Sequence, residues 1–192
     1  MPVVAGDPPA PVPAPDSNTD VTIGPLDCGD LREVGSGAVL TISTAKSGNG
    51  VEQLRDGNLE SFWQSDGAAP HTINIQFSRK MSVSKVCLYM DYTVDESYTA
   101  KKVSIRSGTT QHDLMDISAV ELHEPVGWVH LNLSSENTDG EPLRTHLLQV
   151  RILSMHQNGK DAHVRQLCVY GPRQEEHSVF KTVEMTQYMT VR

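Results

Sequence analysis

Alternating apolar and polar residues recur along the middle of the chain and predict a series of short strands. Thr72–Phe77 alternates cleanly, Ala38–Ser43 alternates more loosely, and Val86–Tyr92 is apolar enough for a central strand. Because successive side chains of a strand point to opposite faces of a sheet, this period of two indicates β-structure. The other strands that the pattern predicts are Lys102–Arg106, Trp128–Leu133, Leu147–Leu153 and Arg165–Tyr170.

Helical spacing of apolar residues is scarce in this chain. The best candidates are two short pieces, Gly50–Leu54 and Asp113–Leu122. A chain with about eight strands and almost no helix favours an all-β fold, and we expect an antiparallel β-sandwich of jelly-roll type.

The composition divides the 192 residues into one domain and two tails. Residues 1–27 carry most of the prolines and few large apolar residues, so we expect a disordered, Pro-rich tail. Residues 28–172 are expected to form the β-sandwich, and Pro172 ends its last strand. Residues 173–192 lose the alternation but keep scattered apolar residues, which is typical of a tail that docks on another molecule.

Charge and cysteine content narrow the possible partners. The 16 Lys and Arg against 24 Asp and Glu give a net charge of −8 without a basic block, so we expect no nucleic acid partner. No apolar run approaches the roughly 20 residues of a membrane span, and we expect no membrane partner and no secretion. The three cysteines form no CxxC pair, which predicts reduced thiols rather than a disulfide or zinc framework.

The stretch Val51–His71 holds the densest turn chemistry and the bulkiest aromatics of the chain. Asp56–Asn58 and Ser65–Gly67 are turn formers, and Phe62 and Trp63 lie between them. Two aromatic rings fixed between tight turns bury much apolar area at one place. We therefore interpret Phe62 and Trp63 as core anchors, not as a stacking platform for a ligand.

Charged residues of the same stretch are interpreted as structural. Arg55 is close in sequence to Asp56 and Asp66. We expect a buried or half-buried ion pair between Arg55 and these carboxylates, fixing the loop.

The sequence carries no recognisable catalytic or metal-binding motif. It has no GxSxG, HExxH, P-loop or dinucleotide fingerprint. His156 and His163 bracket one loop, but the six residues between them match none of the usual zinc spacings. We expect no metal, no cofactor and no catalytic residues.

Two loops carry more polar groups than a turn requires. They are Thr93–Thr99, with its carboxylates and hydroxyls, and His156–Arg165, with amides, a carboxylate and cations. One interpretation is a pair of solvated connectors, and the other is a rim that binds a peptide or a sugar at one end of the sandwich. The pattern alone leaves both open.

Several motifs in the same order resemble a known family. Leu54–Gly67, Pro70-His71, Asp95–Thr99, His156–Gly159 and the terminal Val191-Arg192 are together similar to the DOC-domain subunit of the anaphase-promoting complex. The resemblance runs from about Leu31 to the last residue. It implies a galactose-binding-like jelly roll in a non-catalytic subunit of a multisubunit ubiquitin ligase, acting in the nucleus and cytoplasm.

The resemblance also implies a binding role for the two polar loops. In that family the DOC domain and a WD40 coactivator together hold the destination box, the degron of substrates such as cyclins and securin. By motif, Ser97 and Asn158 face the degron. The residues expected to support them are Tyr98, His156, Asp161, His163 and Arg165.

The last residues are expected to dock on the scaffold, because the family's C-terminal Ile-Arg tail binds a tetratricopeptide-repeat subunit. Here the tail ends in Val-Arg, which removes about one methylene and should preserve docking. A cullin-like subunit is a further implied partner. The expected scaffold-docking residues are Tyr188, Met189, Val191 and Arg192.

A carbohydrate-binding, lectin-like module is the alternative from another class, since jelly rolls often bind sugars. Such a site needs exposed aromatics among the rim loops, and the main candidate is Tyr98. A glycosidase is the weaker alternative and would draw on the loop carboxylates Asp95, Glu96 and Asp161.

Overall fold

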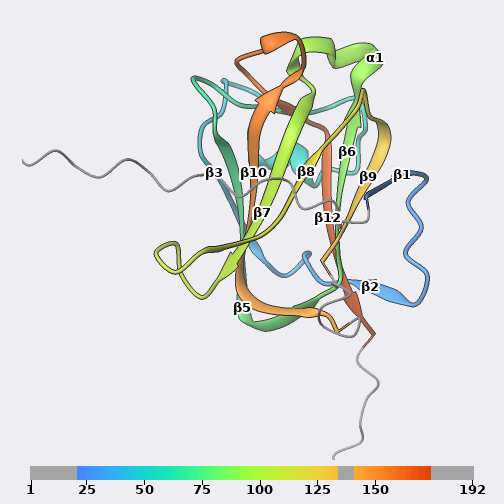
Figure 1. Ribbon diagram of the computed structural model, residues 1–192, viewed down its shortest axis with the longest axis vertical. Coiled ribbons are helices and arrows are strands. Elements are labelled where there is room, and N and C mark those ends of the chain that lie inside the picture. Colours follow the sequence, from blue (N-terminus) through green and yellow to red (C-terminus); the bar gives the residue numbers. More distant parts are fainter. Residues whose placement is uncertain (1–20, 134–140, 174–192) are drawn as a thin grey trace, which may run out of the picture.

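Two antiparallel five-stranded sheets face each other in the computed structural model, which describes residues 21–133 and 141–173 (Figure 1). The first sheet has the order β1-β9-β6-β12-β2. Its strands are β1 (Val21–Gly24), β9 (Val126–Asn132), β6 (Lys85–Asp91), β12 (Gln166–Pro172) and β2 (Leu31–Glu33). The second sheet has the order β3-β5-β10-β7-β8. Its strands are β3 (Val39–Ile42), β5 (His71–Val83), β10 (Leu143–Met155), β7 (Ala100–Gly108) and β8 (Met115–Glu121).

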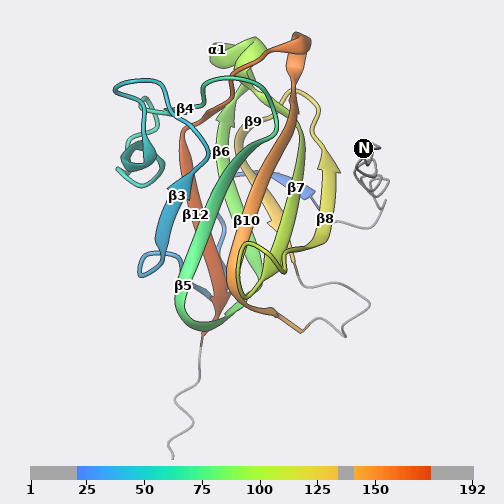
Figure 2. The same ribbon diagram turned by 90° about the vertical axis from the view of Figure 1, so that its left-hand side faces the viewer.

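The core lies between the two sheets, as Figure 2 shows from the side. Val86 and Leu88 of β6 point inward, while Cys87 between them belongs to the other face. Ile73 and Ile75 of β5 meet them from the opposite sheet, and all four side chains are fully buried. The period of two in β5 is the alternation from which that strand was predicted, and β6 is the central strand that its apolar run predicted. The all-β jelly-roll prediction is therefore confirmed.

One predicted helix is wrong. Asp113–Leu122 contains strand β8, which pairs with β7 from Lys102 opposite Glu121 to Ser107 opposite Met115. A register shift between Ile105 and Arg106 interrupts the alternation of this pair, which explains why the period was misread.

The N-terminal boundary also differs from the prediction. Val21–Gly24 form β1 and pair with β9, so the ordered domain starts before residue 28. Residues 1–20 and 174–192 lie outside the described residues, and the interpretation of both tails stays a prediction.

The upper end of the sandwich in Figure 1 carries the short helices. The helix α1 (Tyr92–Asp95) and the 3-10 helix η2 (Glu96–Tyr98) follow β6, and the 3-10 helix η4 (His156–Asn158) follows β10. A further 3-10 helix, η1 (Val51–Leu54), confirms the other short helical prediction. Nowhere in the described residues is a helix long and apolar enough to cross a membrane.

Candidate functional site

The two polar loops predicted from the sequence lie against each other at the upper end of the sandwich (Figures 1 and 2). The amide of His156 donates a hydrogen bond of 2.9 Å to the carbonyl of Thr99. A side chain at Gly159 has no room, because a Cβ there would lie 1.8 Å from the carbonyl oxygen of Ser97. The loops of Ser97 and Asn158 therefore lie side by side at one end of the sandwich, which the rim interpretation requires. We call residues 95–98 and 156–159 the rim.

The rim backbone is held in uncommon conformations. Glu96, Gln157 and Asn158 have φ values of 43°, 50° and 56°, in the left-handed region that non-glycine residues rarely adopt. Such conformations persist only where surrounding contacts fix them, and they are concentrated at functional sites. The side chains of Gln157 and Asn158 are exposed, so this fixed backbone presents them to solvent.

The buried carboxylate of Asp95 is the central hydrogen-bond acceptor at the base of the rim. It is 6 % exposed and accepts hydrogen bonds from His163 Nδ1 at 3.0 Å and from Arg165 Nε and Nη2 at 3.0 and 2.9 Å. Arg165 also donates from Nη1 to the carbonyl of Leu59 at 2.8 Å. The sequence identified Asp95 only as a loop acceptor, because the partners that bury it lie about 70 residues further along.

The Asp95 and Arg165 pair is ionised at neutral pH. Burial by itself would raise the pKa of Asp95, but the hydrogen bonds from His163 and Arg165 outweigh it and lower that pKa below its usual range. Burial likewise would lower the pKa of Arg165, yet the contact with Asp95 leaves it raised. Since a carboxylate only accepts, His163 must carry a proton on Nδ1.

Three rings stack beside this ion pair. The His163 ring lies between those of Phe62 and Tyr98, with centroids 4.1 and 4.2 Å away and interplanar angles of 22° and 12°. The Arg165 guanidinium carbon lies 5.6 Å from the centroid of Phe62. Phe62 is thus only half-buried and supports the rim, which corrects its prediction as a core anchor. Trp63, by contrast, is fully buried, as predicted.

The stretch before β5 supports the second rim loop from below. Lys46 forms an ion pair of 3.0 Å with Asp161, and the Ser65 hydroxyl accepts from the amide of Ala162 at 2.7 Å. Thr44 donates from its hydroxyl to the carbonyl of Asp66 at 2.7 Å, which closes the turn. Asp161 therefore stabilises the loop that follows η4.

Arg55 corrects a second prediction. It donates to the carbonyls of Gly35 and Ala38 at 2.5 and 3.0 Å, and no ion pair joins it to Asp56 or Asp66 among the described residues. Asp56 instead accepts from the amide of Asn58 at 2.8 Å and from Gln166 Nε2 at 2.6 Å. Both side chains are structural, but they act separately.

His156 is half-buried at the start of η4. Its ring meets that of Tyr92 edge to face, with centroids 5.0 Å apart. Burial lowers the pKa of His156, so its ring is neutral at neutral pH. This apolar packing supports η4 and does not place a charge on the rim.

His71, which the sequence left as an isolated histidine, positions the second rim loop. It is 1 % exposed, and its Nε2 lies 2.7 Å from the carbonyl of Lys160. A carbonyl only accepts, so Nε2 carries the proton and donates.

We expect that replacing His71 with asparagine loosens the loop, because its shorter amide cannot reach Lys160. One lost hydrogen bond of about 1 kcal/mol should speed amide hydrogen exchange across residues 157–162 by roughly fivefold, measured by mass spectrometry. Glutamine, whose amide reaches nearly as far as Nε2, should restore the protection. Equal amide exchange rates in the asparagine and glutamine variants would show that the bond from His71 to Lys160 does not hold the loop.

Polar side chains and one partly exposed aromatic ring make up the candidate site. Within residues 21–133 and 141–173, no group of three or more His, Cys, Asp or Glu side chains is arranged to hold a metal ion. An open depression of about 570 Å³ adjoins the rim and is lined in part by Lys46, Asp66 and Lys160. An exposed ring, an amide and a hydroxyl on a rigid rim suit the binding of a flexible ligand.

Solved structures define the class of fold. The family 32 carbohydrate-binding module of NanJ from Clostridium perfringens, solved in complex with galactose, matches with a TM-score of 0.59 and 14 % identity, over 71 % of this chain and 95 % of that chain. Two such domains of ZmpB from the same organism, solved with GalNAc, match with a TM-score of 0.67 and 13 % identity, over 81 % of this chain and 40 % of that chain. The fold is the galactose-binding-like jelly roll.

Sequence relatives define the family. The family described as "Anaphase-promoting complex, subunit 10 (APC10)" matches residues 10–192. The human anaphase-promoting complex subunit 10 is 47 % identical over 169 residues, covering 85 % of this chain and 90 % of the relative. The Saccharomyces cerevisiae subunit DOC1 is 32 % identical over 152 residues, covering 79 % of this chain and 61 % of the relative. The chain belongs to the family of anaphase-promoting complex subunit 10.

The predicted scaffold-docking residues remain untested, because they lie outside the described residues. These are Tyr188, Met189, Val191 and Arg192. The last described strand, β12, ends at Pro172 at the end of the sandwich away from the rim. The last described residues and the rim therefore lie at opposite ends of the domain.

Proposed function

We propose that the rim is one half of a destination-box receptor, the other half being a WD40 coactivator of the anaphase-promoting complex. The observation that carries this proposal is the close approach of Gly159 to Ser97, which joins two loops distant in sequence into a single surface. Ser97 supplies a hydroxyl, Asn158 an amide and Tyr98 a ring that is 39 % exposed. These groups suit hydrogen bonds and apolar contact with an extended peptide.

The proposed contribution of this chain is residence time. Two weak receptors that hold one degron raise its effective concentration at each site, so a substrate such as a cyclin or securin stays bound longer. Longer residence allows more ubiquitins to be added in one binding event. This role needs no acid, base or nucleophile from the chain, and we propose that it is non-catalytic.

Replacing Ser97 and Asn158 together with alanine should reduce processive ubiquitination. Asn158 is exposed and Ser97 half-buried, and neither side chain forms a hydrogen bond or ion pair among the described residues, so the substitution removes mainly the binding groups. The number of ubiquitins added per binding event should fall several-fold, on the order of the avidity lost with one of two sites. Single-turnover reactions with the reconstituted complex and a labelled destination-box substrate measure this number.

The matched control replaces one serine and one asparagine that lie outside the rim. Ser107 and Asn132 lie in β7 and β9, and alanine at both should leave chain length unchanged. The rim variant should also keep its unfolding midpoint and its place in the complex. Unchanged chain length in the rim variant, with coactivator present, would remove the basis of the proposal.

We further propose that the C-terminal residues dock into a tetratricopeptide-repeat subunit, with a cullin-like subunit nearby, in the nucleus and cytoplasm. The charged Arg192 beside the apolar Val191 suits a groove with a polar end. Deleting Val191 and Arg192 should lower co-purification with the other subunits about tenfold, roughly the loss of one charged anchor. Undiminished assembly would show that the sandwich alone does the docking.

Carbohydrate binding is the second candidate, favoured by the exposed ring of Tyr98 beside the polar rim. It predicts that a glycan array detects a ligand and that replacing Tyr98 with alanine abolishes the signal. The degron proposal predicts no glycan signal and a destination-box peptide that binds only with coactivator present.

A further inference from the structure

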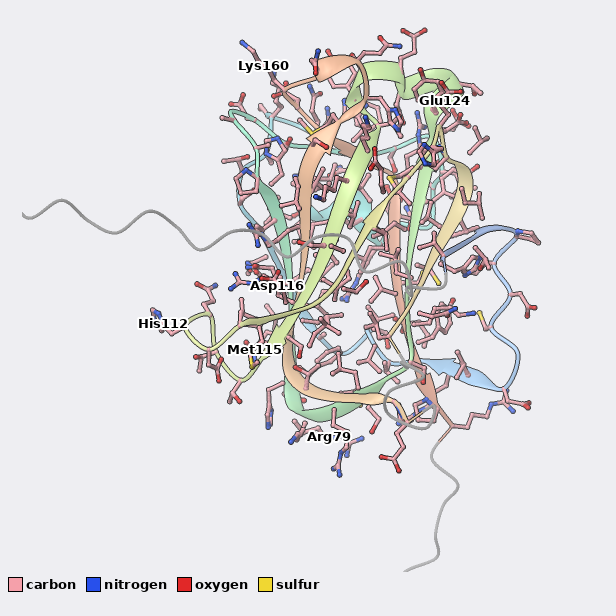
Figure 3. All side chains as sticks on the ribbon, viewed as in Figure 1. Arg79, His112, Met115, Asp116, Glu124 and Lys160 are labelled. Atoms are coloured by element: carbon pink, nitrogen blue, oxygen red, sulfur yellow. The ribbon has the colours of Figure 1, made fainter. Side chains whose placement is uncertain are left out.

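Cations gather at the end of the sandwich opposite the rim, beside the carboxylate of Glu33, although the whole chain carries a net charge of −8. Figure 3 shows Arg79 at this lower end, whereas Lys160 and Glu124 lie at the upper end. A local excess of one charge sign on a protein of the other sign marks a surface with a charged partner.

Five cations gather at this end. Strand pairing places Arg144 opposite Ser82 and Arg32 opposite Gly171. The chain brings further cations beside them at the tip of β5 and after β12. The full set is Arg32, Arg79, Lys80, Arg144 and Arg173. Among the described residues, none of the five takes part in an ion pair.

A pocket of about 420 Å³ opens beside two of these cations, between the edge strand β2 and β5. Arg32 and Arg79 line its sides, and Val34, Phe77 and Met81 supply apolar surface. We call the five lining residues Arg32, Val34, Phe77, Arg79 and Met81 the basic pocket. Its guanidinium groups and apolar surface are complementary to a ligand that carries an acidic side chain next to an apolar one.

Arg32 has a donor left over for a ligand. Its Nε is shielded from solvent and has no hydrogen-bond partner in the part of the chain that the structure describes. Glu33, the acidic residue of the lining, instead accepts from the amide of Ser36 at 2.8 Å. A buried donor without a partner costs free energy, which a bound carboxylate would recover.

We propose that the basic pocket binds an acidic peptide segment of another subunit of the complex. A carboxylate lies between Arg32 and Arg79, and a neighbouring apolar side chain contacts Phe77 and Met81. The pocket and the rim are at opposite ends, so both are occupied at once. The proposal does not depend on the degron role of the rim.

Zero-length cross-linking tests which residues meet there. The assembled complex with the full-length chain is treated with a carbodiimide, which joins lysine amines only to carboxylates in direct contact. Lys80, next to Arg79, should be joined to an Asp or Glu of a neighbouring subunit, and Lys102 of β7 should not. A Lys80 joined only to carboxylates of its own chain, or to none, would overturn the proposal.

Binding strength provides the second measurement. The Arg32→Ala/Arg79→Ala variant should bind a complex that lacks this subunit about tenfold more weakly at moderate salt, while Lys101→Ala/Lys102→Ala stays within about twofold. Unchanged affinity of the arginine variant would contradict the proposal. Loss of wild-type binding after phosphatase treatment would also contradict it, because the anion would then be a phosphate.

Discussion

Replacing Asp95 with asparagine is expected to cost about 3–5 kcal/mol of unfolding free energy, the usual loss when a buried ion pair is broken. The change removes the counter-charge of Arg165, which is 5 % exposed and cannot turn to solvent without unpacking Phe62. It also removes the acceptor that fixes His163 between two rings. Urea unfolding at neutral pH measures the loss, and it should appear as a lower midpoint with an unchanged slope.

The pH dependence of this loss gives an independent check. Because the folded-state pKa of Asp95 is lowered from its ordinary 3.8, its contribution is fully present above about pH 4 to 5 and disappears as pH falls through the folded value. The midpoints of wild type and variant should therefore differ at neutral pH and converge in acid. A gap that persists unchanged below the lowered pKa would show that packing, not charge, is lost.

Asp161 provides the matched control. Its carboxylate also forms an ion pair, with Lys46, but that lysine side chain is 45 % exposed. Solvent screens such a pair, so Asp161→Asn should lower the midpoint far less than Asp95→Asn. Equal losses in the two variants would contradict the central position assigned to Asp95.

Replacing Trp63 with alanine is the second large effect, expected to cost about 3–5 kcal/mol. Its ring is fully buried, its indole nitrogen donates to the carbonyl of Thr44 at 2.9 Å, and its backbone pairs with Val164 in the small sheet of β4 (Trp63–Gln64) and β11 (His163–Val164). Chemical denaturation of the full chain measures the change.

Phe62, its neighbour, gives the contrast. The half-buried ring contacts His163 and Arg165 instead of the core, so alanine there should cost clearly less stability. It should nevertheless weaken degron binding, because the stack under Tyr98 loses one ring. Equal destabilisation by both substitutions would restore the prediction that both rings are core anchors.

The strands and the fold class follow from the sequence because a sheet with one buried face leaves a period of two in the chain. Thr72–Phe77 shows that period and lies within β5. The failures have local causes. Val21–Gly24 is short and follows a Pro-rich segment, and its strand depends on tertiary contacts, namely pairing with β9 and packing of Val21 against the core. In β8 a register shift obscures the alternation.

The site was predicted in part. Its two loops were recognised from their polar groups and from the resemblance, but their distance was not, since no local pattern reports the contact of Gly159 with Ser97. The buried state of Asp95 and the donor role of His71 likewise depend on partners far along the chain. Burial of polar groups is a tertiary property, and a single sequence shows only which residue types are present.

The most direct test of the rim as a degron receptor is photo-cross-linking of a destination-box peptide to the assembled complex with coactivator bound. The peptide carries a benzophenone in place of one side chain at a time, and peptide mapping locates the adducts. We predict adducts on residues 97–98 and 157–158 of this chain, reduced in the Ser97→Ala/Asn158→Ala variant. Adducts confined to the coactivator, or to the lower end of the sandwich, would contradict the proposed receptor.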